Sequence, residues 1–60
     1  MNNYQCYCYG VVALNNIVEA GIPITDDAFY HELNYLWDFY SEEDIERRYS
    51  WLSRNGKMVI

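Results

Sequence analysis

The sequence predicts an all-α fold, a compact three-helix domain with helices at about residues 4–20, 26–40 and 42–54. Three observations lead to this prediction. Apolar residues recur at steps of three and four, which is the spacing along one face of a helix. Each segment begins with a residue that can cap a helix, and the links between segments are short, which favours packed neighbours. A chain of 60 residues has room for a single helical domain, residues 1–60.

The first helix has signals at both ends. Asn2 or Asn3 can cap its start, and Gly21 followed by Pro23 ends it, because proline cannot continue a helix. Residues 4–9 are also rich in types that favour strands, so whether they are helical or extended stays open, although a lone strand would lack a partner. The predicted inward face is Tyr4, Tyr7, Cys8, Val11, Leu14 and Val18, with Gln5, Asn16 and Glu19 toward solvent, the side on which Tyr9 and Val12 also fall.

The second helix begins after Thr25, a good N-cap. Asp26 and Asp27 in its first turn oppose the positive end of the helix dipole. Its apolar stripe is predicted to be Phe29, Leu33, Leu36, Trp37 and Tyr40, and its polar stripe Asp27, His31, Asn34 and Asp38.

The third helix begins at Ser41, which resembles a capping box with Asp44 in place of the usual Glu or Gln. Glu43 and Asp44 stand four residues before Arg47 and Arg48, the favourable order for ion pairs along a helix. Asn55-Gly56 ends the helix, and whether residues 57–60 are ordered stays open. Its inward residues complete a predicted core of Tyr7, Val11, Leu14, Val18, Phe29, Leu33, Leu36, Trp37, Ile45, Tyr49 and Leu52.

The charges are segregated along the chain, whose net charge is −5. Residues 1–18 carry none, the acids lie between Glu19 and Glu46, and the bases follow from Arg47 to Lys57. An acidic total argues against direct nucleic-acid binding, which Lys and Arg drive by displacing counterions. We expect no secretory leader and no membrane contact, because the first residues lack a positive region and no apolar run reaches about 18 residues. Reduced thiols then suit a cytoplasmic protein.

Candidate chemical groups are few. His31 with Asp27 one turn before it could hold a metal ion, but a structural site needs about four ligands, so an exposed polar face is the better interpretation. Cys6 and Cys8 are too poor a pattern for a metal site and are interpreted as small hydrophobes. We therefore expect no catalytic residues, no metal and no cofactor, and do not expect an enzyme.

Aromatic residues are the most unusual feature: seven Tyr, two Phe and two Trp. A small domain can use such large side chains to fill its core, but aromatics are also enriched where proteins meet. A chain this short needs additional buried area, which favours a homo-oligomer, with a dimer as the first guess. The candidate interface residues are Tyr9, Tyr30, Tyr35, Trp37, Phe39 and Trp51.

The sequence resembles small uncharacterised proteins carried by phages and prophages of Gram-positive bacteria. The resemblance is carried by residues 12–15, 19–21 and 35–43. It implies a cytoplasmic accessory protein that binds a host or phage protein. The function expected is an acidic protein–protein interaction module that self-associates through aromatic helix faces. The alternative is an acidic inhibitor that mimics nucleic acid and blocks a basic groove of a host enzyme.

Overall fold

A computed structural model describes residues 1–58, which form three α-helices and no strand. Helix α1 spans Asn3–Glu19, α2 spans Asp26–Phe39 and α3 spans Glu42–Arg54. The predicted all-α class and the order of the helices are confirmed, and residues 4–9 are helical rather than extended. The open question about the tail is answered only as far as Met58, which packs against the core; residues 59–60 lie outside the described part.

The predicted caps fix where the helices begin. In α1, the side-chain oxygen of Asn2 accepts from the backbone N–H of Gln5 at 2.8 Å, and the Gln5 side chain accepts from the N–H of Asn2 at 2.9 Å. Ser41 and Asp44 form the same reciprocal box at the start of α3. Thr25 caps α2 through its hydroxyl. These bonds satisfy backbone N–H groups that have no partner within a helix.

Two of the helices end in the same glycine motif. Gly21 has a φ of 72° and Gly56 a φ of 62°, a left-handed conformation that favours glycine. After α1, the N–H of Ile22 donates to the carbonyl of Ile17 at 3.1 Å, which is the long bond of a Schellman motif. Helix α2 ends differently, at the extended Tyr40, and the cap of α3 follows directly, so the chain turns sharply there.

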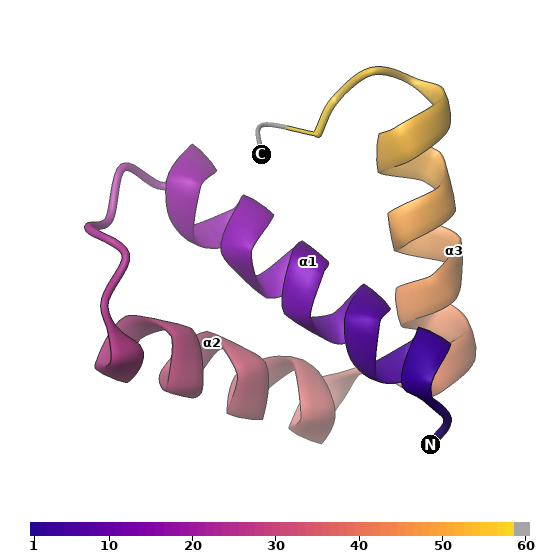
Figure 1. Cartoon of the computed structure of the whole chain (residues 1–60), viewed down its shortest axis with the longest axis horizontal. Helices are drawn as coiled ribbons and strands as arrows, with labels where there is room; N and C mark the ends of the chain where they lie inside the picture. Colours follow the sequence, from indigo (N-terminus) through magenta and orange to yellow (C-terminus); the bar gives the residue numbers. More distant parts are fainter. Residues whose placement is uncertain (59–60) are drawn as a thin grey trace.

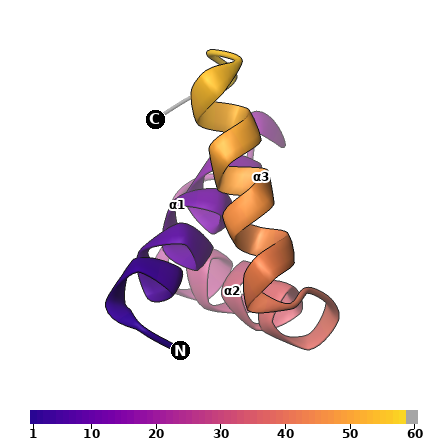
Figure 2. The ribbon, with the colours of Figure 1, turned by 90° about the vertical axis from the view of Figure 1, so that its right-hand side faces the viewer.

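Helix α1 is the centre of the fold. It packs against both α2 and α3, whereas within the described residues those two helices do not pack against each other. They diverge from the turn that joins them, with α1 between them (Figure 1). The view from the α3 side shows α3 crossing α1 with α2 beneath (Figure 2). The arrangement is therefore an open V around one helix rather than a closed bundle.

The core lies along α1. Leu36, Ile45 and Leu52 are buried as predicted, and Phe29, Leu33 and Tyr49 pack half-buried against them. The buried residues of α1, however, are Cys8, Tyr9, Val12, Ala13, Asn15 and Ile17. Of these, only Cys8 belongs to the predicted inward face.

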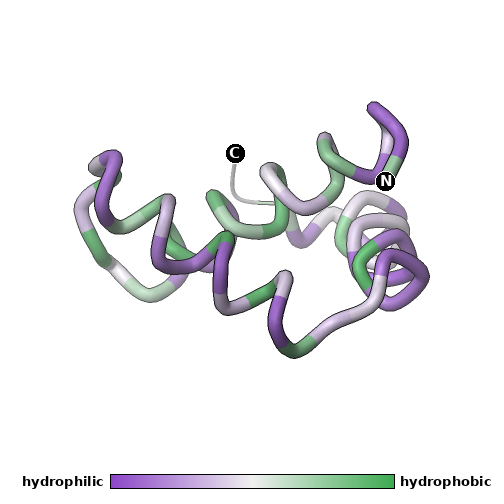
Figure 3. Tube along the Cα trace, turned by 90° about the horizontal axis from the view of Figure 1, so that it is seen from below, coloured by the Kyte–Doolittle hydropathy of each residue, from purple (hydrophilic) through white to green (hydrophobic). Residues whose placement is uncertain are grey.

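The prediction for α1 was therefore wrong in orientation, by roughly a third of a turn at 100° per residue. Val11, Leu14 and Val18 are only half-buried, and Tyr7 is 57% exposed. The physical reason is that α1 carries no charge before Glu19 and is apolar nearly all round, so periodicity alone does not choose a face. Trp37 was also misplaced, since it is 44% exposed at the edge of α2. By contrast, α3 is largely hydrophilic with isolated hydrophobic residues (Figure 3).

Candidate protein-interaction groove

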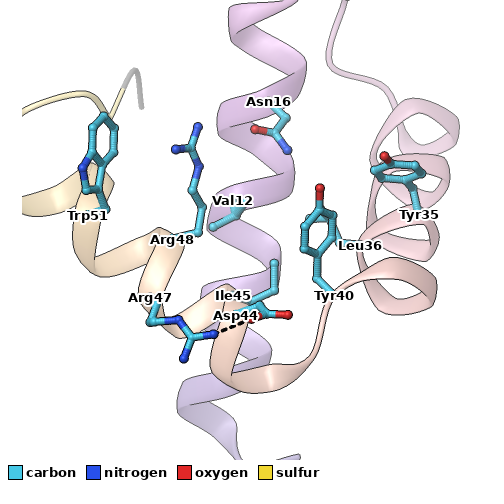
Figure 4. A pocket seen from close by; sticks show the side chains of 10 residues that line it. All are labelled: Val12, Asn16, Tyr35, Leu36, Tyr40, Asp44, Ile45, Arg47, Arg48 and Trp51. Carbon is cyan, nitrogen blue, oxygen red and sulfur yellow. Dashed lines mark hydrogen bonds and ion pairs between the residues drawn. The ribbon is translucent and has the colours of Figure 1, made fainter.

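The divergence of α2 and α3 leaves a groove of about 830 Å³ on one face of the molecule. Figure 4 shows α1 as its floor, with Val12 and Asn16 between the two flanking helices. The flanking helices α2 and α3 meet at the turn near Tyr40 and diverge away from it (Figure 1), and we call these two ends of the groove narrow and wide. Its lining residues are Val12, Asn16, Tyr35, Leu36, Tyr40, Asp44, Ile45, Arg47, Arg48 and Trp51.

One side of the groove, which we call the α2 wall, is lined by the aromatic rings of Tyr35 and Tyr40. Two further residues adjoin this wall: Phe39 through the ring of Tyr35, and Glu32 through the groove residue Asn16. The Tyr35 ring lies 4.9 Å from the Phe39 ring and 6.3 Å from the Tyr40 ring, measured between centroids. Phe39 is 69% exposed, so the monomer leaves much of this surface in water. Glu32 is half-buried, and its carboxylate accepts from the side-chain amide of Asn16 at 2.9 Å. The bond fixes a negative charge beside the groove floor.

The opposite side of the groove, which we call the α3 wall, consists of Asp44, Arg47, Arg48 and Trp51. Its two arginines give it positive charge. Arg47 is paired locally, with Asp44 and, at 3.9 Å, with Glu43. The predicted Glu43–Arg47 pair is present, but the predicted Asp44–Arg48 pair is not, because Asp44 pairs with Arg47 instead. Arg48 has no carboxylate partner in the described part of the chain, and its guanidinium lies 5.3 Å from the centre of the Trp51 ring. One uncompensated cation thus faces the groove.

The Asp44 carboxyl has a lowered pKa. The largest cause is the hydrogen bond from the Ser41 backbone N–H, followed by that from the Ser41 hydroxyl and by the charge of Arg47. Each of these favours the ionised carboxylate. Asp44 is thus held as an anion at the narrow end of the groove, where it also caps α3.

The structure divides the predicted interface residues into three groups. Tyr35 and Trp51 line the groove and Phe39 adjoins it through Tyr35. Tyr30 and Trp37 are exposed on the other flank of α2, two helical turns apart. Whether any of these five residues meets a partner stays a prediction.

Tyr9 is the exception, because it is buried in the core with 2% exposure. Its hydroxyl donates to the Tyr40 carbonyl at 2.7 Å, and its ring contacts that of Trp37. Burial raises the pKa of its phenol, with Glu42 and Asp44 adding to the effect. The assignment of Tyr9 to an exposed interface was therefore wrong, for the same reason that the face of α1 was misjudged.

Sequence reasoning missed two charged residues of the groove, Glu32 and Arg48. The charge of Arg48 had been assigned to an ion pair along the helix, and Glu32 to no function. Only the three-dimensional arrangement shows that Arg48 lines the groove from α3 and that Glu32 of α2 is bonded to Asn16 on the groove floor. Their signal in the sequence is weak, since each is an ordinary charge on an amphipathic helix.

Other candidate groups lie apart from the groove. Cys6 is exposed, and Cys8 is a buried thiol whose pKa is raised mainly by burial. His31 is exposed and its ring contacts only that of its neighbour Tyr30 among the described rings. Over residues 1–58, no three His, Cys, Asp or Glu side chains come together as a potential metal site. The same part of the chain contains no helix of the length and hydrophobicity needed to cross a membrane.

The fold and the groove define a small all-α domain with an open, aromatic-lined cleft between two helices. No protein-family model matches the chain, and neither the curated proteins nor the solved structures contain a significant match. The groove is therefore the feature of the molecule on which a function can be proposed.

Proposed function

We propose that the protein is an acidic protein–protein interaction module that self-associates through its aromatic helix faces, most simply as a dimer. One observation carries this proposal: Tyr35, Phe39 and Trp51 are all exposed beside an open groove. Aromatic side chains beside buried apolar residues such as Val12 and Leu36 are typical of the centre of a protein interface. Association would remove them from water.

The size of the molecule supports self-association. The described surface measures 4168 Å², and a stable interface covers about 800 Å² on each partner, roughly a fifth of this area. A domain of this size buries only about 60% of its unfolded surface, so a second copy would add considerable stability. The open V of α2 and α3 provides the unfilled space that a partner can occupy.

The rival function, an acidic mimic of nucleic acid, has less support because many of the acids have local roles. Glu19 accepts from Asn15 and Glu46 accepts from Gln5. Asp26 and Asp27 lie in the first turn of α2, and α3 likewise begins with acids. A nucleic-acid mimic needs a row of free carboxylates, whereas the carboxylates of this chain are spread over several helices. The setting that the resemblance implies, a phage or prophage accessory protein in the cytoplasm, is part of the present proposal.

The test is the molar mass in solution, measured by light scattering on a sizing column over a hundredfold range of concentration. We expect the mass of a dimer at the higher concentrations. The double variant Tyr35→Ala/Phe39→Ala should remain monomeric, and its helical circular dichroism should match that of the wild type. A wild-type protein that stays monomeric throughout would contradict the proposal.

If a host enzyme is found that the protein inhibits, the rival can be tested separately. Inhibition through nucleic-acid mimicry should weaken steeply as the salt concentration rises, because exposed charges would carry the binding.

A further inference from the structure

We infer that two copies pair groove to groove about a two-fold axis that runs along the groove. In this arrangement Arg48 of each copy meets Glu32 of the partner subunit, and Trp51 packs against Tyr35 of the partner subunit. The inference rests on the proposed self-association and specifies its geometry. The groove of each copy is thus occupied by the second copy of this chain.

The charges of the two walls are complementary. The α2 wall contains no base, and one acid, Glu32, lies beside it and is bonded to the groove residue Asn16. The α3 wall contains Arg47, which its neighbours Glu43 and Asp44 neutralise, and Arg48, which no carboxylate in the described part of the chain neutralises. Because α2 and α3 diverge within one copy, Arg48 does not pair with Glu32 of its own chain. A second copy can supply the missing carboxylate.

Symmetry determines which walls meet. A two-fold axis along the groove turns the second copy over sideways, so each α2 wall faces the α3 wall of the other copy. An axis across the groove would instead place α2 against α2 and α3 against α3, bringing like charges together at an energetic cost. Complementary charge therefore selects the axis along the groove, and the contact is isologous and closed.

The positions along the groove also agree. Figure 4 shows Arg48, Asn16 and Tyr35 toward the wide end, with Asp44 and Tyr40 nearer the narrow end. Glu32 is bonded to Asn16, so it lies toward the wide end as well. A two-fold axis along the groove preserves this position, which brings Arg48 and Glu32 to the same level. The Asn16 bond uses Oε2 of Glu32 and leaves Oε1 able to accept from a guanidinium.

The surrounding aromatic rings increase the contribution of this ion pair to the affinity of the dimer. Arg48 already lies over the Trp51 ring, which orients the guanidinium before association. When Trp51 covers Tyr35 of the partner subunit, water is excluded from the pair. A charge pair in such a desolvated interface contributes more to affinity than an exposed pair does.

The experiment uses two variants with opposite charges, Glu32→Arg and Arg48→Glu. Each alone places like charges at both contacts of the dimer, so each should weaken self-association by at least about tenfold. When the two are mixed in equal amounts, the new arginine of one meets the new glutamate of the other, and the second contact keeps its native charges. The mixture should therefore form a heterodimer whose Kd is within about threefold of the wild-type value, measured by sedimentation and native mass spectrometry.

Two controls accompany this test. Asp38→Arg makes the same charge change on the exposed side of α2, outside the groove, and should leave the Kd unchanged. Glu32→Gln keeps an acceptor for Asn16 but removes the charge, so it should raise the Kd less than Glu32→Arg does. Circular dichroism of every variant verifies that the helices are intact.

The outcomes separate the two proposals. A dimeric wild type with recovery in the mixture supports the groove-to-groove pairing. A dimeric wild type whose charge variants dimerise equally well, or do not recover on mixing, overturns the pairing and leaves self-association standing through another face. A wild type that is monomeric at every concentration overturns both.

Discussion

Helices α1 and α3 differ in how clearly their sequences indicate a buried face. In α3, charged residues surround a single apolar stripe, and its members Ile45 and Leu52 are the ones that are buried. In α1, apolar residues occur on every side, and the buried face is set by the positions of α2 and α3. Periodicity therefore orients a helix only where polar residues exclude the other orientations. For a central helix, packing decides.

The strongest test of this comparison uses two adjacent valines of α1. Val12 is 2% exposed under the groove, whereas Val11 belongs to the face that the periodicity had selected and is only half-buried. Val12→Asp should lower the free energy of unfolding by more than about 3 kcal/mol, because it buries a charge without a partner. Val11→Asp should cost about 1 kcal/mol, because its carboxylate can reach water. Urea unfolding followed by circular dichroism measures the loss in both variants. A larger loss for Val11→Asp than for Val12→Asp would support the orientation of α1 that the periodicity had predicted.

A smaller effect tests the placement of Tyr9, the interface candidate that proved to be buried. Tyr9→Phe keeps the ring but removes the hydroxyl that donates to the Tyr40 carbonyl. The free energy of unfolding should fall by about 1 kcal/mol, the usual net value of one hydrogen bond. Tyr30→Phe makes the same change at an exposed position of α2 and should have almost no effect. Equal losses in the two variants would place the hydroxyl of Tyr9 in solvent.

Much of the fold could be predicted from the sequence because its signals are local. The caps Asn2, Thr25 and Ser41 act within four residues of themselves, and Gly21 ends α1 through its own backbone conformation. The groove could be predicted only in part. The aromatic residues Tyr35 and Trp51 were visible as surplus, but the divergence of α2 from α3 depends on how both pack against α1. Nothing local in the sequence records that geometry.

An effect of similar size is expected at the start of α3, where sequence and structure agree most closely. Ser41→Ala removes the hydroxyl that accepts from the Asp44 N–H and donates toward its carboxylate, and should cost about 1 kcal/mol in the free energy of unfolding. The Asp44 carboxylate adds a pH dependence. Its pKa is lower in the folded than in the unfolded protein, chiefly because of the Ser41 backbone N–H, so its stabilising contribution is present above the unfolded pKa. This contribution is lost as the pH falls through the folded pKa.

Asp44→Asn isolates that contribution, because it keeps a side-chain oxygen for the Ser41 N–H but cannot ionise. Unfolding free energies of the wild type and of Asp44→Asn are measured from neutral pH down to about pH 2, below the usual range of carboxyl pKa values. We expect the difference between their free energies of unfolding to shrink toward acid pH. Ser41→Ala removes the second cause of the lowered Asp44 pKa, so its free energy of unfolding should decline less than that of the wild type as the pH falls. A difference that stays constant with pH would mean that the charge of Asp44 does not stabilise α3. The local agreement between sequence and structure would then rest on the hydrogen bonds of the capping box alone.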